Sequence, residues 1–202
     1  MGELVVITFV TLDGVMQGPG GREEDTSGGF EQGGWQAPVS DDGTGDFLTG
    51  VFERPGGYLL GRKTYEIFAS YWPKQPDEDN PIAAKLNSLP KYVASRTLDD
   101  PEWGPATVLR DAAAEVPAAQ EKVDGELQVW GSAKLVQSLY AAGLVDRHHI
   151  LTYPVVLGTG KRLFEPGSKP SAMRLVQSHA TPNGTVISTY ERAGEPTYED
   201  VA

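Results

Sequence analysis

The sequence predicts an α/β protein in which helices cover both faces of a mixed, mostly parallel sheet. Strand-like and helix-like segments alternate at short intervals from residue 4 to residue 156, as in parallel strands joined by crossover helices. The first strand-like run, 4–10, is continuously apolar and β-branched, which is typical of a strand buried on both faces. Near the C-terminus, two alternating segments flank Pro182-Asn183-Gly184 and predict an antiparallel hairpin.

The expected elements of the first half are a helix over 46–54, a strand over 58–60, a helix over 61–72 and a helix over 81–89. The first of these helices ends at Pro55-Gly56-Gly57. The second, whose hydrophobic residues recur on one face, ends at Pro73. Asn80-Pro81 supplies an N-cap and a first-position proline for the third helix.

The expected elements of the second half are strands over 91–95, 107–109, 127–130 and 148–156, helices over 112–123 and 133–142, and hairpin strands over 173–179 and 185–190. Pro117 weakens the first helix because proline lacks the N–H of an interior helical position. Ser132 is placed to cap the second helix and Gly143 to end it. We therefore expect one domain over 1–190 and an acidic tail over 191–202.

Composition narrows the classes of function. The chain has 202 residues, with 28 acidic and 17 basic side chains and a formal net charge of −11. This balance argues against a nucleic-acid-binding surface, which needs clustered lysine and arginine. Because there is no cysteine, disulfides and thiolate metal sites are excluded. No apolar run approaches the roughly 18 residues of a membrane helix, and no signal-peptide pattern occurs, so we expect a soluble cytoplasmic protein without a membrane partner.

Glycine is concentrated near the N-terminus. Thirteen of the 24 glycines lie between Asp13 and Gly57, and residues 23–46 hold seven acidic residues and no basic one. A segment of this kind is either a mobile functional loop or a disordered insertion. Trp35 lies inside it, and an isolated aromatic residue there is suited to covering a planar ligand.

Three predicted strand ends carry small and basic residues. They are Leu60-Gly61-Arg62-Lys63-Thr64, Ala94-Ser95-Arg96-Thr97 and Val129-Trp130-Gly131-Ser132-Ala133-Lys134. Helix N-termini at the carboxyl ends of strands present free N–H groups, which bind phosphates. Each junction taken alone is explained by the geometric need for glycine and serine. The three together favour a phosphate site at which an acidic protein concentrates its positive charge.

Motifs for other chemistries do not occur in the sequence. It contains no glycine-rich dinucleotide fingerprint, Walker loop, nucleophile elbow or His-Glu-x-x-His pair. His148 and His149 are adjacent in a predicted strand, so their side chains face opposite ways and cannot chelate one ion. We expect both of them, and His179, to be structural or surface residues, and we predict no metal site.

Seven short motifs follow one another along the chain. They are Thr11-Leu12-Asp13-Gly14 with Met16, Gly18-Pro19, Gly61-Arg62-Lys63-Thr64-Tyr65-Glu66, Ser95-Arg96-Thr97-Leu98, Gly131-Ser132, Gly143-Leu144-Val145-Asp146 and the segment 154–164. In this order they resemble the dihydrofolate-reductase-like superfamily over residues 3–190, closest to the reductase domain of riboflavin-biosynthesis deaminase/reductases. The resemblance implies a three-layer sandwich with a mixed, mostly parallel sheet and a C-terminal antiparallel hairpin.

The resemblance also implies NADPH as cofactor and assigns its contacts by position. Gly61, Arg62, Lys63 and Thr64, together with Gly131, Ser132, Ala133 and Lys134, match the turns at the cofactor's phosphates. Ser95, Arg96 and Thr97 match the turn at the adenosine 2′-phosphate, for which a guanidinium has suitable bidentate geometry. Val10, Asp13, Gly14 and Met16 match the strand end and loop beside the nicotinamide. The segment 14–45 matches the lid that closes over nicotinamide and substrate.

The substrate end is assigned in the same way. Asp46 falls nearest the carboxylate that anchors substrate in folate reductases, although an acid there is also an ordinary N-cap or first-turn residue. Thr152 aligns with a strand threonine that supports that site. Trp35 and the loop residues Leu157, Gly158 and Phe164 are the expected substrate contacts.

The expected function is therefore NADPH-dependent reduction of a planar heterocycle, such as a pteridine or a ribosyl- or ribitylamino-pyrimidine, by a monomer or homodimer. The alternative is a protein of the same fold that binds NADP(H) without turnover, because the cofactor positions match the family better than the substrate positions do.

Overall fold

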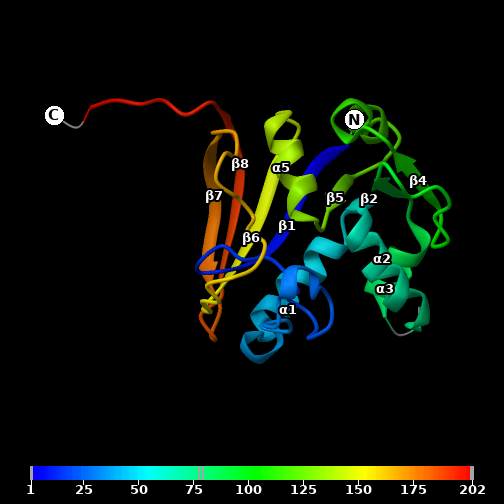
Figure 1. The fold of residues 1–202 in the computed structure, drawn as a ribbon, viewed down its shortest axis with the longest axis horizontal. Helices are drawn as coiled ribbons and strands as arrows, with labels where there is room; N and C mark the ends of the chain where they lie inside the picture. The colour runs from blue at the N-terminus through cyan, green and yellow to red at the C-terminus, as the bar shows by residue number, and fades with distance from the viewer. Residues whose placement is uncertain (1, 77, 79, 201–202) are drawn as a thin grey trace.

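The computed structural model describes residues 2–76, 78 and 80–200. Within them, eight strands form one sheet in the order β4-β3-β2-β5-β1-β6-β8-β7. The strands are β1 (Glu3–Thr11), β2 (Pro55–Gly61), β3 (Lys91–Ala94), β4 (Ala106–Leu109), β5 (Glu126–Val129), β6 (Arg147–Tyr153), β7 (Ala172–Ala180) and β8 (Val186–Gly194). All pairings from β4 to β6 are parallel, whereas β8 pairs antiparallel with β6 and β7. Figure 1 shows the β7–β8 hairpin at one end of the sheet and β4 at the other, which confirms the predicted mixed α/β architecture.

The helices are α1 (Asp42–Phe52), α2 (Arg62–Tyr71), α3 (Pro81–Ser88), α4 (Ala112–Gln120) and α5 (Ala133–Ala141), with short 3-10 turns η1 (Ser27–Gly29), η2 (Ala37–Val39) and η3 (Trp72–Lys74). Among the described residues, no helix is long and apolar enough to cross a lipid bilayer.

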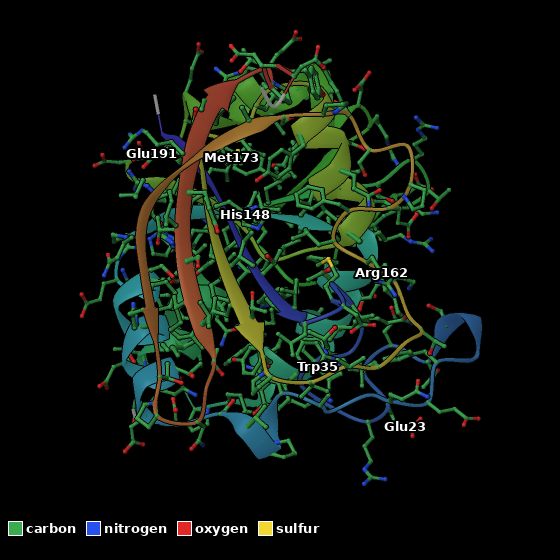
Figure 2. All side chains as sticks on the ribbon, turned by 90° about the vertical axis from the view of Figure 1, so that its left-hand side faces the viewer. Glu23, Trp35, His148, Arg162, Met173 and Glu191 are labelled. Atoms are coloured by element: carbon green, nitrogen blue, oxygen red, sulfur yellow. The ribbon has the colours of Figure 1, made fainter. Side chains whose placement is uncertain are left out.

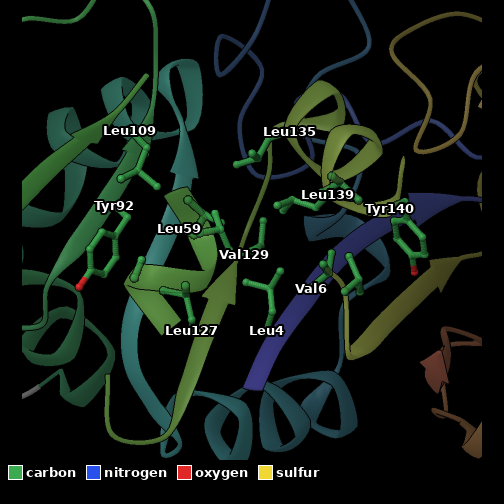
Figure 3. Packing of buried hydrophobic residues seen from close by; sticks show 14 of the residues in the cluster. Leu4, Val6, Leu59, Tyr92, Leu109, Leu127, Val129, Leu135, Leu139 and Tyr140 are labelled. Atoms are coloured by element: carbon green, nitrogen blue, oxygen red, sulfur yellow. The ribbon is translucent and has the colours of Figure 1, made fainter. Parts of the chain in front are cut away.

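Buried side chains fill both faces of the sheet. On one face, α4 and α5 pack on Leu4 and Val6 of β1 and on the neighbouring strands (Figure 3). On the other face, Val5 and Ile7 pack with α1, while α2 and α3 cover β2 and β3. Burial on both faces explains why β1 is apolar at successive positions rather than alternating.

Several element boundaries differ from those predicted. α1 begins at Asp42 rather than residue 46, because the Asp41 carboxylate accepts the N–H of Thr44 at 3.0 Å and caps the helix there. Ser132 occupies the N-cap position of α5, but its side chain makes no capping hydrogen bond. β8 continues to Gly194 through its pairing with β7, so the predicted domain end at residue 190 falls inside a strand.

The glycine-rich segment between β1 and α1 packs onto the core. Val15, Phe30 and Trp35 are buried in the same cluster as Leu151 and Tyr153 of β6. The segment is therefore anchored by apolar side chains at several points between its glycines.

Candidate functional site

The carboxyl ends of β2, β3 and β5 lie side by side. Gly61 pairs with Ala94 at the end of β3, and Leu59 pairs with Val129 at the end of β5. β2 leads directly into α2, and β5 leads through residues 130–132 into α5. The three turns selected from the sequence therefore meet at one edge of the sheet.

Two glycines allow the starts of α2 and α5 to approach each other. The N–H of Gly61 donates to the carbonyl of Gly131 at 3.0 Å. A Cβ on Gly61 would lie 2.5 Å from Ser132 Oγ and 3.0 Å from its backbone nitrogen. Gly131 has a φ of 122°, a conformation that side-chain-bearing residues rarely adopt. Glycine is therefore required at both positions by the geometry of this junction.

The N-termini of α2 and α5 differ from those of the other helices. Asp41, Asn80 and Asp111 cap α1, α3 and α4 with side-chain hydrogen bonds. In the part of the chain that the structure describes, neither α2 nor α5 has such a cap. First-turn N–H groups without an intrahelical partner need an acceptor from water or a ligand. The two uncapped helices are those that start at the strand ends described above.

A groove of about 610 Å³ lies over these helix starts. Its basic side chains are Arg62, Lys63, Arg96, Arg110 and Lys134.

The basic residues of the groove fall into two groups. Arg62 donates to Thr97 Oγ1 at 2.9 Å, and Arg110 donates to Asp99 Oδ1 at 2.8 Å. The side chains of Lys63, Arg96 and Lys134 are exposed and make no hydrogen bond or ion pair with the described residues. In a chain of net charge −11, three uncompensated cations beside two uncapped helix N-termini fit a ligand that carries phosphate groups.

A smaller cavity of about 130 Å³ adjoins the groove and shares Lys63 and Ser132 with it. Its apolar wall includes the aromatic rings of Phe9, Phe68 and Trp130. Trp130 is held in place because its ring stacks on Phe52, with centroids 4.6 Å apart, and its Nε1 donates to Gln128 Oε1 at 3.2 Å. The cavity thus presents rigid, flat apolar surfaces.

The glycine-rich segment supplies the other side of this cavity. Asp25, whose side chain is 12% exposed, lies 2.5 Å from the Nζ of Lys161, and both residues line the cavity. Lys161 Nζ also donates to Ser27 Oγ at 2.6 Å. Burial raises the pKa of Asp25, but hydrogen bonds from Lys161 and Ser27 outweigh it, so the net shift is downward. The cavity therefore contains an ionised carboxylate with its own counter-charge.

Most of the predicted cofactor residues come together at the groove and cavity. Those that line one or both are Met16, Gly61, Arg62, Lys63, Thr64, Ser95, Arg96, Gly131, Ser132, Ala133 and Lys134. Val10, Asp13, Gly14 and Thr97 line neither. Val10 is packed in the core beneath α5, and Thr97 accepts the hydrogen bond from Arg62.

Asp13 joins two loops. Its carboxylate accepts hydrogen bonds from Thr11 Oγ1 at 2.6 Å and from the N–H groups of Leu157 and Gly158 at 3.2 and 2.9 Å. The hydrogen bond from Thr11, followed by those from Gly158 and Leu157, lowers the pKa of Asp13 to about 2 against the opposing effect of desolvation. Arg162 donates to its backbone carbonyl. Asp13 therefore anchors the loop that follows β6.

The predicted catalytic and substrate residues, unlike most of the predicted cofactor residues, lie outside both the groove and the cavity. Asp46 is exposed in the second turn of α1, and Thr152 is half-buried in β6. Neither lines the cavity, and nor do Leu157, Gly158 and Phe164.

Trp35 is a core residue rather than a cover for a ligand. It is 7% exposed, its ring centroid lies 5.6 Å from that of Tyr153, and its Nε1 donates to the carbonyl of Gln17 at 2.8 Å (Figure 2). Other residues that line the groove and cavity were not among the predicted site residues; they include Phe9, Asp25, Phe68, Arg110, Trp130 and Lys161. Trp130 and Lys161 nevertheless lie within motifs that the sequence displays, next to the glycines Gly131 and Gly160.

The RibD C-terminal domain family model matches residues 3–187 of the chain. A curated relative, the uncharacterized protein YyaP of Bacillus subtilis (strain 168), is 28% identical over 193 residues, which cover 95% of each chain.

Solved structures show the same fold. A putative riboflavin biosynthesis protein from Shewanella sp. PV-4 superimposes with a TM-score of 0.68 at 22% identity, covering 95% of this chain and 99% of the other. A pyrimidine reductase-like protein from Corynebacterium diphtheriae has a TM-score of 0.62 at 13% identity, covering 96% and 93%. Dihydrofolate reductase from Enterococcus faecalis, complexed with NADP(H), has a TM-score of 0.61 at 18% identity, covering 95% and 97%.

Proposed function

Because the chain belongs to the family of RibD C-terminal domains, we propose that it is a reductase that binds NADPH and delivers hydride to a planar heterocycle. The substrate classes that we propose are pteridines and ribosyl- or ribitylamino-pyrimidines. One observation carries the proposal: a groove in which Lys63, Arg96 and Lys134 have no partner among the described residues continues into a cavity walled by aromatic rings. The cationic groove suits the phosphate groups of a dinucleotide. The aromatic cavity suits the two flat rings between which hydride is transferred.

Different residues of the groove are suited to different phosphate groups of the cofactor. The free N–H groups of α2 and α5, with Lys63 and Lys134, are suited to the pyrophosphate. Arg96 lies on the turn after β3 and is suited to a 2′-phosphate, because its planar fork of donors matches two phosphate oxygens. The solved Enterococcus faecalis relative of this fold was complexed with NADP(H), which supports the choice of cofactor.

The residues of the cavity orient the rings and exclude water. NADPH, when bound, supplies the hydride. Phe9, Phe68 and Trp130 offer surfaces on which heterocycles pack, and the glycine-rich segment closes the other side. We propose that Asp25, rather than Asp46, is the carboxylate that faces the substrate, because Asp25 lines the cavity.

A second candidate function is binding of NADP(H) without turnover. The hydrogen bonds of Asp25 favour this alternative. Its carboxylate already accepts hydrogen bonds from Lys161 and Ser27, so it is not free to anchor a substrate.

Binding and turnover can be tested separately. NADPH should raise the melting temperature and quench tryptophan fluorescence, because Trp130 lines the cavity. The double substitution Lys63→Gln/Lys134→Gln should abolish both effects, whereas Lys74→Gln, an exposed lysine in η3 outside the groove, should leave them unchanged. Absence of any effect at millimolar NADPH would contradict the proposal. Stopped-flow oxidation of NADPH with pterins and aminopyrimidines then separates the reductase from the binding protein.

A further inference from the structure

Gln17 is a buried polar residue at the start of the glycine-rich segment. It is 4% exposed and lines the aromatic cavity. Its Nε2 donates to the carbonyls of Asp25 and Ser27 at 3.1 and 2.9 Å, and its Oε1 accepts the N–H of Lys161 at 3.0 Å. Because a carbonyl only accepts and an N–H only donates, these partners fix the orientation of the amide. All three partners are main-chain groups, so the Gln17 side chain joins two stretches of backbone.

Two of these partners belong to the residues that form the ion pair of the cavity. Gln17 contacts the main chain of Asp25 and of Lys161, while the Lys161 Nζ lies 2.5 Å from the Asp25 carboxylate. Asp25 lies in the glycine-rich segment, and Lys161 lies in the β6–β7 loop, residues 154–171. Figure 2 shows these two segments beside each other, near its labels for Trp35 and Arg162. One amide therefore sets the distance between the two segments at the point where their charged side chains pair.

The β6–β7 loop is itself anchored to α5 and to the turn after β1. Gln137 of α5 donates from its Nε2 to the carbonyls of Arg162 and Leu163 at 3.3 and 3.0 Å. The N–H of Leu163 donates to the carbonyl of Gly14 at 2.9 Å. Because this loop is held on both sides, the hydrogen bonds of Gln17 hold the glycine-rich segment in place against it.

The ion pair by itself is a weaker constraint than the amide. The side chain of Lys161 is 43% exposed, and water screens ion pairs at such positions. The amide of Gln17 is shielded, so its loss would leave two carbonyls and one N–H without this partner where water reaches them poorly. The main-chain carbonyl of Gln17 accepts from Trp35 Nε1 at 2.8 Å, and a change of side chain does not remove that acceptor. A substitution at position 17 therefore tests the amide itself.

We propose that Gln17 is a positioning residue for the cavity. Its amide holds Asp25 and Lys161 at a fixed separation and keeps the glycine-rich segment closed against the β6–β7 loop. Gln17 acts through Asp25, the carboxylate proposed above to face the substrate, and takes no part in the transfer of hydride or protons. The consequence for turnover rests on the proposed reductase function, whereas the positions of Asp25 and Lys161 do not.

Trypsin measures whether the segment stays in place. Arg22 is exposed, and it is the only lysine or arginine among residues 1–53, so release of a fragment ending at Arg22 reports cleavage in the glycine-rich segment. Gln17→Met keeps nearly the same length and removes both donors and the acceptor. We expect it to accelerate this cleavage at least about tenfold, because the cleavage rate follows the population of the open segment. Gln17→Glu, which keeps the acceptor but not the two donors, should also accelerate it.

Two controls separate opening of the segment from unfolding of the whole domain. Gln32→Met changes an exposed glutamine of the same segment and should keep the wild-type rate of cleavage after Arg22. Cleavage after Lys85, inside α3, requires unfolding of that helix and should stay at least about tenfold slower than cleavage after Arg22 in every variant. Equal rates at the two sites in Gln17→Met would show global unfolding and overturn the local role proposed for Gln17.

A third variant separates the amide from the ion pair. Lys161→Met removes the ion pair but keeps the contact with Gln17, because that contact uses the backbone of Lys161. It should accelerate cleavage after Arg22 less than about threefold. Equal acceleration by Lys161→Met and Gln17→Met would assign the constraint to the ion pair and overturn the proposal. So would a wild-type rate in Gln17→Met.

The pKa of Asp25 gives a readout that a general loss of stability would not change. Burial raises this pKa, but the hydrogen bonds from Lys161 and Ser27 outweigh it and hold the pKa below its usual range. In protein with ¹³C-labelled aspartate, assigned by comparison with Asp25→Asn, Gln17→Met should raise the pKa of Asp25, because its carboxylate no longer meets both donors. Gln32→Met should leave the pKa unchanged. A wild-type pKa of Asp25 in Gln17→Met would overturn the proposal.

Neither measurement uses NADPH, so this proposal and the proposed function can fail separately. Faster cleavage and a raised Asp25 pKa in Gln17→Met, with no binding of NADPH to the wild type, would contradict the proposed function alone. If the protein reduces a pterin or an aminopyrimidine, Gln17→Met should lower kcat about tenfold and leave KM for NADPH within about twofold, because Gln17 does not line the groove. A wild-type kcat in that variant would overturn the positioning role.

Discussion

Gly61 and Gly131 join the ends of β2 and β5 through a hydrogen bond of 3.0 Å from the N–H of Gly61 to the carbonyl of Gly131. This contact places the first turns of α2 and α5 next to each other. The basic groove therefore depends on the absence of a side chain at position 61, where Ser132 occupies the space that a Cβ would need.

Gly61→Ala should disturb both the fold and the groove. The new Cβ would lie 2.5 Å from Ser132 Oγ and 3.0 Å from its backbone nitrogen, so the starts of α2 and α5 must separate. We expect a loss of about 1–3 kcal/mol in the free energy of unfolding, measured with urea, and at least about tenfold weaker NADPH binding. Gly45→Ala is the control. Gly45 lies inside α1. Apart from its chain neighbours and the backbone of its own helix, no atom of the described residues lies within 4 Å of the position that its Cβ would take, so alanine there should stabilise the protein by about 0.5–1 kcal/mol. If Gly61→Ala kept the wild-type stability and NADPH affinity, the prediction would be wrong, because α2 and α5 would then accommodate the new side chain without separating.

Arg96→Ala should change the preference between cofactors. Arg96 is exposed in the groove without a partner among the described residues, and it is the residue proposed for the 2′-phosphate. Because NADH lacks that phosphate, we expect NADPH affinity to fall about tenfold or more and NADH affinity to change little. Fluorescence titrations with both cofactors measure the ratio. Arg174→Ala, on β7 and away from the groove, should not alter it. Equal losses for the two cofactors would remove Arg96 from the 2′-phosphate site.

Comparison of Asp25→Asn with Asp46→Asn should identify the carboxylate that matters. Asp25 lines the cavity and pairs with Lys161, whereas Asp46 is exposed on α1. We expect Asp25→Asn to lower kcat at least about tenfold and stability by about 1 kcal/mol, because the amide leaves Lys161 without a counter-charge. Asp46→Asn should leave both quantities at wild-type values. The reverse pattern would restore the role that family resemblance suggests for Asp46.

Stability should fall as the pH is lowered from neutrality. Burial, the first cause for each, lowers the pKa of His148 to about 3 and of His149 to about 4, whereas an unfolded histidine has a pKa of about 6.5. Below about pH 6.5 the unfolded chain binds protons that the folded chain does not. The stabilisation is therefore complete above that pH. It is lost on acidification toward about pH 4 for His149 and about pH 3 for His148, by up to about 1.4 kcal/mol per pH unit for each histidine.

Urea unfolding at about pH 7.5 and about pH 5.5 measures this loss. His149→Gln should remove about half of the difference, since one of the two buried imidazoles is gone. His179→Gln, at an exposed position of β7, should keep the full difference. If His149→Gln retained the wild-type dependence, another group would be responsible for it.

Local sequence was sufficient for the order of the elements and for the residues that meet in the basic groove. Buried strands, helix-ending prolines and the Asn80 cap act over a few residues, and the structure confirms them. Gly61 and Gly131 could also be selected locally, because each lies where a strand passes into a helix. His148 and His149 face opposite ways, as the alternation of a strand requires.

The composition of the aromatic cavity was decided by tertiary structure. The glycine-rich segment has no periodicity, so nothing local indicates that Trp35 meets Tyr153 or that Asp25 meets Lys161, residues far away along the chain. Asp46, in contrast, turns outward because Asp41 starts α1 four residues earlier than its apolar spacing predicts. Which carboxylate faces the cavity, and which aromatic ring is core, depends on contacts between distant segments. Such contacts form only when the sheet brings those segments together.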